Sequence, residues 1–196
     1  MTGKTRDVRD FINNGFAFQK LLDSLDESES RQLESPFGSV EEIIEPFLDT
    51  FPDYKKRHAK QMARYYEIIY LLETMLRSSI AAMLSDDDPE DWWENKVPQH
   101  IIDDVRRIKE DEVNAGISLR SKENLDYTTF GQLVDIIKAN KEAASTQFIS
   151  VQGLLRILAV LNKLRSPIAH NNILHPDEVA RLYVAVRDLF RLRRTN

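Results

Sequence analysis

The chain has 196 residues, 42% of them hydrophobic and 30% charged, which fits one folded domain with a small appendage and excludes a chain that stays disordered. Because cysteine is absent, disulfides, cysteine-bound zinc, iron–sulfur clusters and thiolate catalysis are excluded. The net charge of −5 argues against a surface made as a whole for nucleic acid. Residues 151–196, however, carry eight basic against three acidic residues, and residues 1–150 carry nineteen against twenty-nine. Any anionic partner is therefore expected near the C-terminal third.

Membrane association is not expected from the hydropathy pattern. The longest apolar runs fall far short of the ~20 residues that cross a bilayer, and the N-terminal residues lack the apolar core of a signal peptide. The sequence therefore predicts a cytoplasmic protein.

Apolar residues recur at spacings of three and four, which predicts an all-α fold. The first helix is expected from Asp7 to about Leu25, and a polar linker over 26–39. A short helix should begin at Ser39 and be disturbed by Pro46. We expect residues 1–52 to form an N-terminal helical appendage and residues 53–196 to form the main helical domain.

The longest helix is expected from Asp53 to about Leu84, where no glycine or proline interrupts the pattern. Asp88 is expected to cap the following helix, with Pro89 at its first position. Pro98 should open another helix, and the polar stretch 114–126 should be a loop.

The C-terminal third should contain the most apolar helix of the domain. Thr128 or Thr129 is expected to cap the helix before it. Ser150 should cap the apolar helix itself, over Val151 to about Arg165, and its composition predicts burial on several sides. Pro167 should kink or end this helix.

Arg165 and His170 stand out at the end of this apolar helix. Histidine exchanges protons near neutral pH, and arginine holds a phosphate by two parallel hydrogen bonds. Together they supply the minimum set of groups for cleaving an RNA phosphodiester. On a straight helix the two would diverge by about 140°, unless Pro167 realigns them or a second subunit completes the site. The alternative is structural, with Arg165 capping carbonyls and His170 bonding to a loop.

The surrounding sequence is similar to the HEPN superfamily, whose ribonuclease members carry R-x-x-x-x-H to R-x-x-x-x-x-x-H at the end of a buried helix. The string LNKLRSPIAHNN has the shorter spacing. Further blocks resemble the branch related to the yeast nuclear-pore-associated RNA endonuclease and its bacterial relatives. They are Tyr65–Tyr66 with Leu72–Glu73 and Leu76–Arg77, Asp91–Trp93 before Val97–Pro98, and Leu125–Phe130, within a resemblance that covers roughly residues 55–192.

The resemblance implies an antiparallel helical bundle that forms a homodimer, with two Arg165/His170 pairs in one cleft and no metal or other cofactor. His170 would be the acid–base group and Arg165 would stabilise charge on the transferring phosphate. Ser166 stands where family nucleases often carry Asn, Asp or His, so it is a departure within the motif. Asn171 follows His170 and would help to orient the phosphate.

Two further sets of charged residues each allow two interpretations. Glu73 and Arg77 are either a surface pair on one helix face or supports for Arg165 and His170. A last helix should begin at Pro176 and end in basic residues, which either track RNA phosphates or complement the helix dipole. These basic residues are Arg187, Arg191, Arg193 and Arg194.

Aromatic and acidic neighbours elsewhere in the chain favour structural roles. Trp92 and Trp93 could stack RNA bases, but the acidic residues around them favour packing instead. The aspartates at 86–88 favour a solvated loop over a metal cluster, and the remaining histidines show no metal-ligand spacing.

The function expected from the resemblance is a metal-independent endoribonuclease for single-stranded RNA. It would be a toxin or defence effector under control. The control would come from the acidic N-terminal appendage, from an antitoxin or another regulatory partner protein, or from activation by assembly. The alternative is a non-catalytic HEPN-type module that binds a partner protein or a nucleotide.

Overall fold

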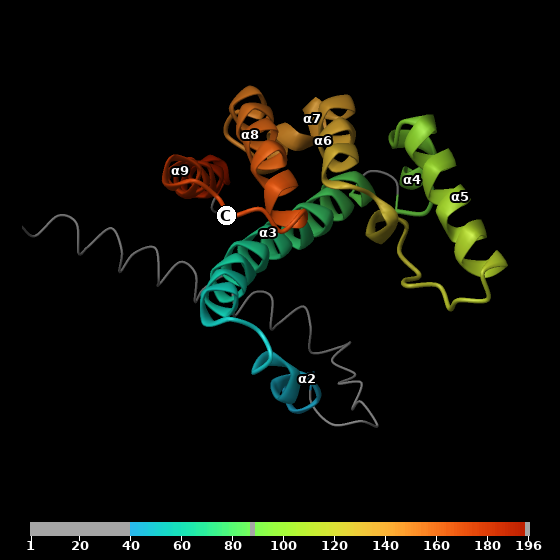
Figure 1. Ribbon diagram of the computed structural model, residues 1–196. Helices are drawn as coiled ribbons and strands as arrows, with labels where there is room; N and C mark the ends of the chain where they lie inside the picture. Colours follow the sequence, from blue (N-terminus) through green and yellow to red (C-terminus); the bar gives the residue numbers. More distant parts are fainter. Residues whose placement is uncertain (1–39, 87–88, 195–196) are drawn as a thin grey trace, which may run out of the picture. The chain divides into compact units, whose positions relative to one another are not determined.

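The computed structural model describes residues 40–86 and 89–194 (Figure 1). Contacts divide the chain into two units, Met1–Pro52 and Asp53–Asn196. The helix expected over 7–25, the linker over 26–39 and the Asp88 cap lie outside the described residues. In the first unit, α2 (Val40–Leu48) contains Pro46 and ends two residues after it, because proline removes a backbone donor from the helical ladder.

The described part of the second unit consists of helices joined by turns and loops. An isolated bridge between Phe148 and Arg193 is the only extended pairing among the described residues. The all-α prediction is therefore confirmed, in the form of a helical bundle. Its elements are α3 (Asp53–Ser85), α4 (Trp92–Lys96), α5 (Gln99–Asn114), the 3₁₀ turn η1 (Asn124–Tyr127), α6 (Phe130–Ala139), α7 (Lys141–Gln147), α8 (Val151–Ala169) and α9 (Pro176–Leu192).

The helix α3 is the longest of this unit, and it confirms the long helix predicted over 53–84. It contacts α4, η1, α6, α7 and α8, which stand along it in Figure 1 with α9 beyond α8. Only its second half enters the core. The buried residues of α3 are Ile69, Leu72, Met75, Leu76, Ser79, Ile80, Met83 and Leu84.

The helix α8 is less buried than its composition predicts. Its buried residues form one stripe, whereas Val160 is 40% exposed. The expectation of burial on several sides is therefore wrong within the described chain, because the apolar residues outside the stripe find no neighbouring helix that covers them fully. The stripe consists of Leu154, Leu158, Leu161, Leu164 and Ile168.

Helix starts follow the capping signals at two positions and depart from them at a third. Thr129 and Gln132 form a reciprocal capping box at α6, and the hydroxyl oxygen of Ser150 accepts a bond from the Gly153 amide at α8, 3.1 Å away. The expected start at Pro89 is wrong, since residues 89–91 form a turn and α4 begins at Trp92.

Pro167 lies in the last turn of α8, which ends two residues after it, close to the expected end. The helix continues to Ala169, and the amide of His170 donates to the Ser166 carbonyl at 3.1 Å, beyond the proline. A proline in the last turn costs one ladder bond, and the turn survives because the next amides still donate to carbonyls.

The helix α7 was not predicted, because its polar sequence shows no apolar stripe.

Within the described residues, α3 is the one helix long and apolar enough to suit a membrane span. Of the apolar window in α3, 44% is buried inside the structure. The buried side chains of this stretch belong to the core of the bundle.

Candidate active site

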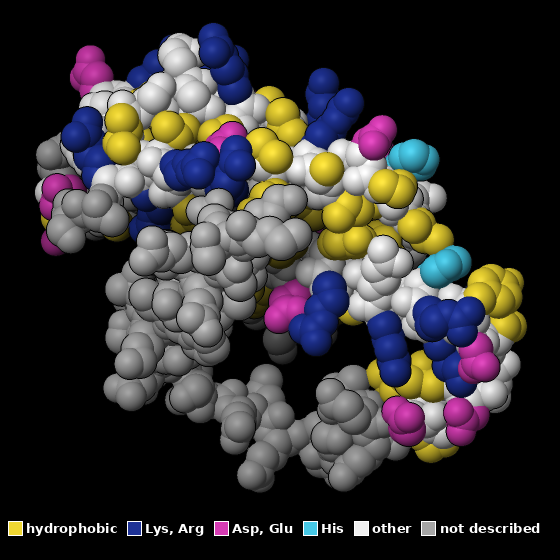
Figure 2. All heavy atoms as spheres, turned by 90° about the vertical axis from the view of Figure 1, so that its left-hand side faces the viewer, with side chains coloured by type: hydrophobic (Ala, Val, Ile, Leu, Met, Phe, Trp, Pro, Cys, Tyr) yellow, Lys and Arg dark blue, Asp and Glu magenta, His cyan; other side chains and the backbone are white. Residues whose placement is uncertain are grey.

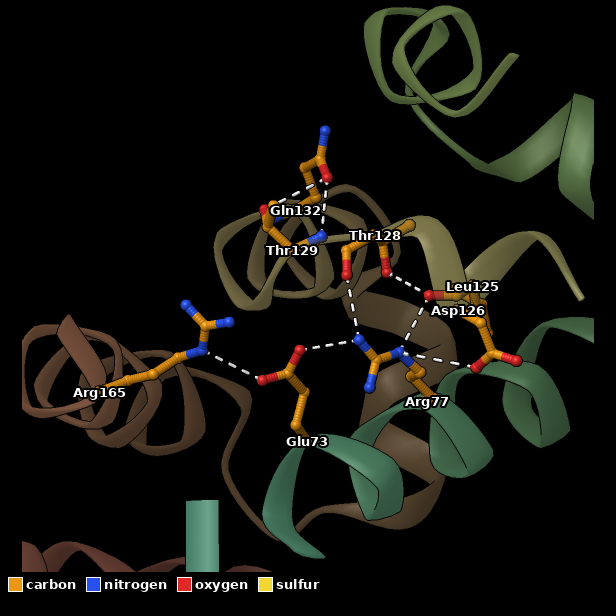
Figure 3. A network of polar contacts seen from close by, with 8 residues as sticks. All are labelled: Glu73, Arg77, Leu125, Asp126, Thr128, Thr129, Gln132 and Arg165. Carbon is orange, nitrogen blue, oxygen red and sulfur yellow. Dashed lines mark hydrogen bonds and ion pairs between the residues drawn. The ribbon is translucent and has the colours of Figure 1, made fainter. Parts of the chain in front are cut away.

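A chain of polar contacts joins α8 to α3 at the candidate site (Figure 3). The Nε of Arg165 donates to Glu73 Oε2 at 3.1 Å, and Nη2 of Arg77 donates to Glu73 Oε1 at 2.7 Å. The side chain of Glu73 is only 12% exposed. The Glu73 carboxylate is thus shared by two arginines, Arg77 and Arg165, which lie far apart in the sequence.

Arg77 fixes the other end of this network to the loop before α6. Its Nε donates to the Leu125 carbonyl at 2.9 Å and its Nη2 donates to the Thr128 carbonyl at 3.0 Å. The Thr128 hydroxyl also donates to the Leu125 carbonyl, at 2.6 Å. A guanidinium presents several donors in a rigid fork, which suits this simultaneous binding. Arg77 therefore anchors η1 to α3 and holds Glu73 in place.

The geometry of Arg165 leaves part of its guanidinium open. Its side chain is 34% exposed, and Figure 3 shows its two terminal nitrogens directed away from the Glu73 carboxylate. Within residues 40–86 and 89–194, the Glu73 carboxylate is the only group recorded as a partner of the guanidinium of Arg165. A guanidinium can bind phosphate oxygens by paired N–H donors, and the orientation of the Arg165 terminal nitrogens is compatible with such binding.

His170 lies at the C-terminal cap of α8 and is exposed. Because α8 remains helical through Ala169, Arg165 and His170 lie about 140° apart around the helix axis. No hydrogen bond joins their side chains among the described residues. One chain therefore holds the two residues on the same helix end without bringing them together.

The two neighbours of this pair have backbone roles in the structure. Ser166 is exposed, and its carbonyl accepts the His170 amide. Asn171 has φ of 58°, a left-handed conformation that asparagine tolerates better than most residues. It reverses the chain after α8, and its amide donates to the Ile168 carbonyl at 3.2 Å.

The basic residues of the C-terminal end have partners of their own. Arg187 and Arg191 lie 2.9 Å and 3.8 Å from the Asp188 carboxylate. Arg194 Nε donates to the Ser145 carbonyl at 3.2 Å. Figure 2, which faces the side where α9 lies, shows Lys and Arg side chains interspersed with hydrophobic ones. They do not gather into a single basic patch on that face.

Arg193 is directed to the opposite side of α3 from Glu73. Its Nη1 lies 3.5 Å from the sulfur of Met75, and burial lowers the pKa of its guanidinium below the ordinary value. Met75 and Glu73 are two residues apart, so they lie about 200° apart around α3. Arg193 is therefore not brought to the Arg165 site.

A cavity of about 300 Å³ has Arg77 in its lining. Trp92, Trp93 and Asp126 are among its lining residues. Trp93 is buried and its ring meets Trp92 edge to face at 5.8 Å, which is packing as expected. Among the described residues, no group of three His, Cys, Asp or Glu could hold a metal ion.

The part of the site that sequence reasoning missed is the pair of carbonyls that bind Arg77. Backbone oxygens leave no trace in side-chain patterns, so the sequence did not assign Leu125 and Thr128 a role in the site. Comparisons with protein-family models, with curated proteins and with solved structures find no match to this chain.

Proposed function

We propose that this protein is a metal-independent endoribonuclease that cuts single-stranded RNA at a site completed by a homodimer. The observation that carries the proposal is Arg165, which Glu73 fixes through Nε while its terminal nitrogens face outward beside the helix end that bears His170. The resemblance to HEPN ribonucleases supports the same residues. It also supports a role as a cytoplasmic toxin or defence effector restrained by a partner protein.

The chemistry needs only proton transfer and charge stabilisation. His170 takes the proton of a ribose 2′-hydroxyl, the 2′-oxygen attacks the adjacent phosphorus, and the bond to the 5′-oxygen breaks. The departing 5′-oxygen takes up a proton from a protonated His170 imidazolium, which leaves a 2′,3′-cyclic phosphate and a 5′-hydroxyl end. Arg165 donates to the phosphate oxygens, where negative charge grows in the transition state.

Within one chain Arg165 and His170 lie apart, so a second copy of the chain would have to bring its own Arg165 and His170 to complete the site. Residues on the outer side of α8 recur at spacings of four, three and four, which places them on one stripe. That stripe includes His170, so a partner packed there would bring its own groups to the histidine. The exposed members of the stripe are Ala159, Lys163, Ser166 and His170.

The test is cleavage of a labelled single-stranded RNA by the purified full chain in EDTA. Arg165→Ala and His170→Ala should each lower the rate by 100-fold or more, the usual order for a lost acid–base or charge-stabilising group. Matched controls remove the same residue types elsewhere. Arg181→Ala on α9 and His100→Ala on α5, both exposed, should cleave like the wild type.

Product ends and assembly complete the test. Cyclic phosphate ends, and a specific activity that rises with the dimer fraction in light scattering, are the expected results. Cleavage that persists in folded Arg165→Ala and His170→Ala proteins would contradict the site assignment. A folded wild-type dimer that cuts no RNA would favour the non-catalytic module that binds a partner protein or nucleotide.

A further inference from the structure

The first half of α3 extends beyond the core of the bundle. None of its residues from Asp53 to Ile68 is buried, and sixteen residues at 1.5 Å per residue span about 24 Å. This stretch carries five lysines and arginines against Asp53 and Glu67. Lys56 and Arg64 form ion pairs with Asp53 and Glu67. At 100° per residue, Lys55 is the one of the five that shares the helix face of Tyr66.

Two tyrosines at the end of this stretch form an exposed aromatic pair. Tyr66 and Tyr70 are 58% and 57% exposed, and their rings stack with centroids 6.4 Å apart and planes 28° apart. Large aromatic side chains in this state leave their π faces to solvent. Nucleobases stack on such faces with little regard to base identity, and cations beside the rings track the backbone.

The pair lies on the face of α3 that leads to the candidate active site. Tyr66, Tyr70, Glu73 and Arg77 follow one another at spacings of four, three and four, which places them along one stripe of the helix. Tyr70 precedes Glu73 by about 4.5 Å along the axis, and Tyr66 by about 10.5 Å. Glu73 in turn binds Arg165. A strand whose phosphate meets Arg165 would pass a neighbouring nucleotide over the tyrosines.

The stripe that contains Tyr66 continues toward the N-terminal end of α3 and remains exposed there. Ala59 and Ala63 continue it toward the start of α3, and both are small and exposed. Lys55 lies at its far end, with no ion pair to another described residue. Small side chains between a cation and an aromatic pair leave room for an extended strand along the helix.

We propose that Tyr66 and Tyr70 form a base-stacking subsite for single-stranded RNA, next to the phosphate position at Arg165. The subsite rests on the proposed function for the identity of its ligand. Its contribution is affinity and placement of the strand, and the chemical step belongs to Arg165 and His170.

Binding can be measured separately from cleavage with a fluorescent 2′-O-methyl RNA oligonucleotide, which lacks the attacking hydroxyl. The full chain carrying Tyr66→Ala and Tyr70→Ala should bind this probe at least 10-fold more weakly in fluorescence anisotropy. The matched double change to Phe keeps both rings and should bind within about threefold of the wild type. Circular dichroism should show all variants folded, because exposed side chains contribute little to stability.

A tyrosine on another side of the same helix provides the control. Tyr54 is also exposed, but it lies about 120–160° around α3 from the pair. Tyr54→Ala should bind the probe like the wild type. Weakening by Tyr54→Ala equal to that of the double Ala variant would overturn the subsite, because it would assign the effect to the helix as a whole.

The two proposals fail in different ways. If the wild type binds the probe through the tyrosines but cuts no RNA, the subsite stands and the ribonuclease is wrong. If the wild type cuts RNA and the double Ala variant binds and cuts equally well, the subsite is wrong. A wild type that fails to bind the probe at all, or tyrosines that instead control self-association in light scattering, would also overturn the subsite.

Discussion

Glu73 is the residue whose change most directly tests the architecture of the site. Glu73→Gln keeps the size and shape of the side chain but removes the negative charge that two arginines share. It also places an amide donor where a carboxylate oxygen accepted a bond. Arg77 and Arg165 would then face each other across a neutral group in a partly buried position.

The expected loss follows from the exposure of the two pairs. A desolvated hydrogen bond to a charged group contributes about 1.5–3 kcal/mol, and the bond from Arg77 is the more enclosed, with side chains 20% and 12% exposed. The bond from Arg165 is more open to solvent and belongs nearer the surface range of about 0–1 kcal/mol. We expect a loss of about 2–3 kcal/mol in the free energy of unfolding. For a unit of this size that is a fall in melting temperature of about 8 °C.

Urea unfolding followed by circular dichroism measures this loss, with Glu67→Gln as the matched control. Glu67 pairs with Arg64 on the exposed part of the same helix, so its change should cost less than about 0.5 kcal/mol. Equal small losses in the two variants would refute the view that Glu73 organises the site. A large loss in Glu67→Gln would refute the exposure argument itself.

Three further outcomes are expected. Leu158→Ala should cost about 2.5–5 kcal/mol in urea unfolding because it opens a cavity at a fully buried position, and a loss below 1 kcal/mol would contradict the packing of α8. Thr129→Ala removes one half of the capping box with Gln132 and should cost about 1 kcal/mol, with faster amide exchange in the first turn of α6 as the local readout. Burial raises the pKa of Glu112, but hydrogen bonds and charge from Arg120 outweigh it and lower the pKa below the ordinary 4.5. The stabilisation from this pair is therefore present above about pH 4.5 and lost as the pH falls through the folded value; Arg120→Ala should raise the NMR titration midpoint of Glu112, and an unchanged midpoint would contradict the assignment.

Local signals predicted most helix starts in the main unit. Thr129 and Ser150 cap their helices because a side-chain oxygen satisfies an amide within three residues, which the sequence shows directly. The helix start predicted at Pro89 was wrong because the fixed φ of proline suits a turn as well as a first helical position. The start at Trp92 depends on contacts beyond the local sequence.

The site shows the same division between local and distant information. The spacing of Glu73 and Arg77 predicts their contact, which the structure contains. The contact of Glu73 with Arg165, however, joins residues 92 positions apart, and only the packing of α8 on α3 determines it. Likewise, composition predicts an apolar α8 but not which helices cover it.

Pro167 has a consequence for motion at the helix end. Because proline has no N–H, the Lys163 carbonyl loses its ladder bond. The carbonyls of the last turn, those of Ser166, Pro167 and Ile168, still accept backbone amides. The turn that carries Arg165 has a further restraint, the contact of its guanidinium with Glu73. His170 is therefore held less firmly than Arg165, so the two residues differ in how far their positions can change.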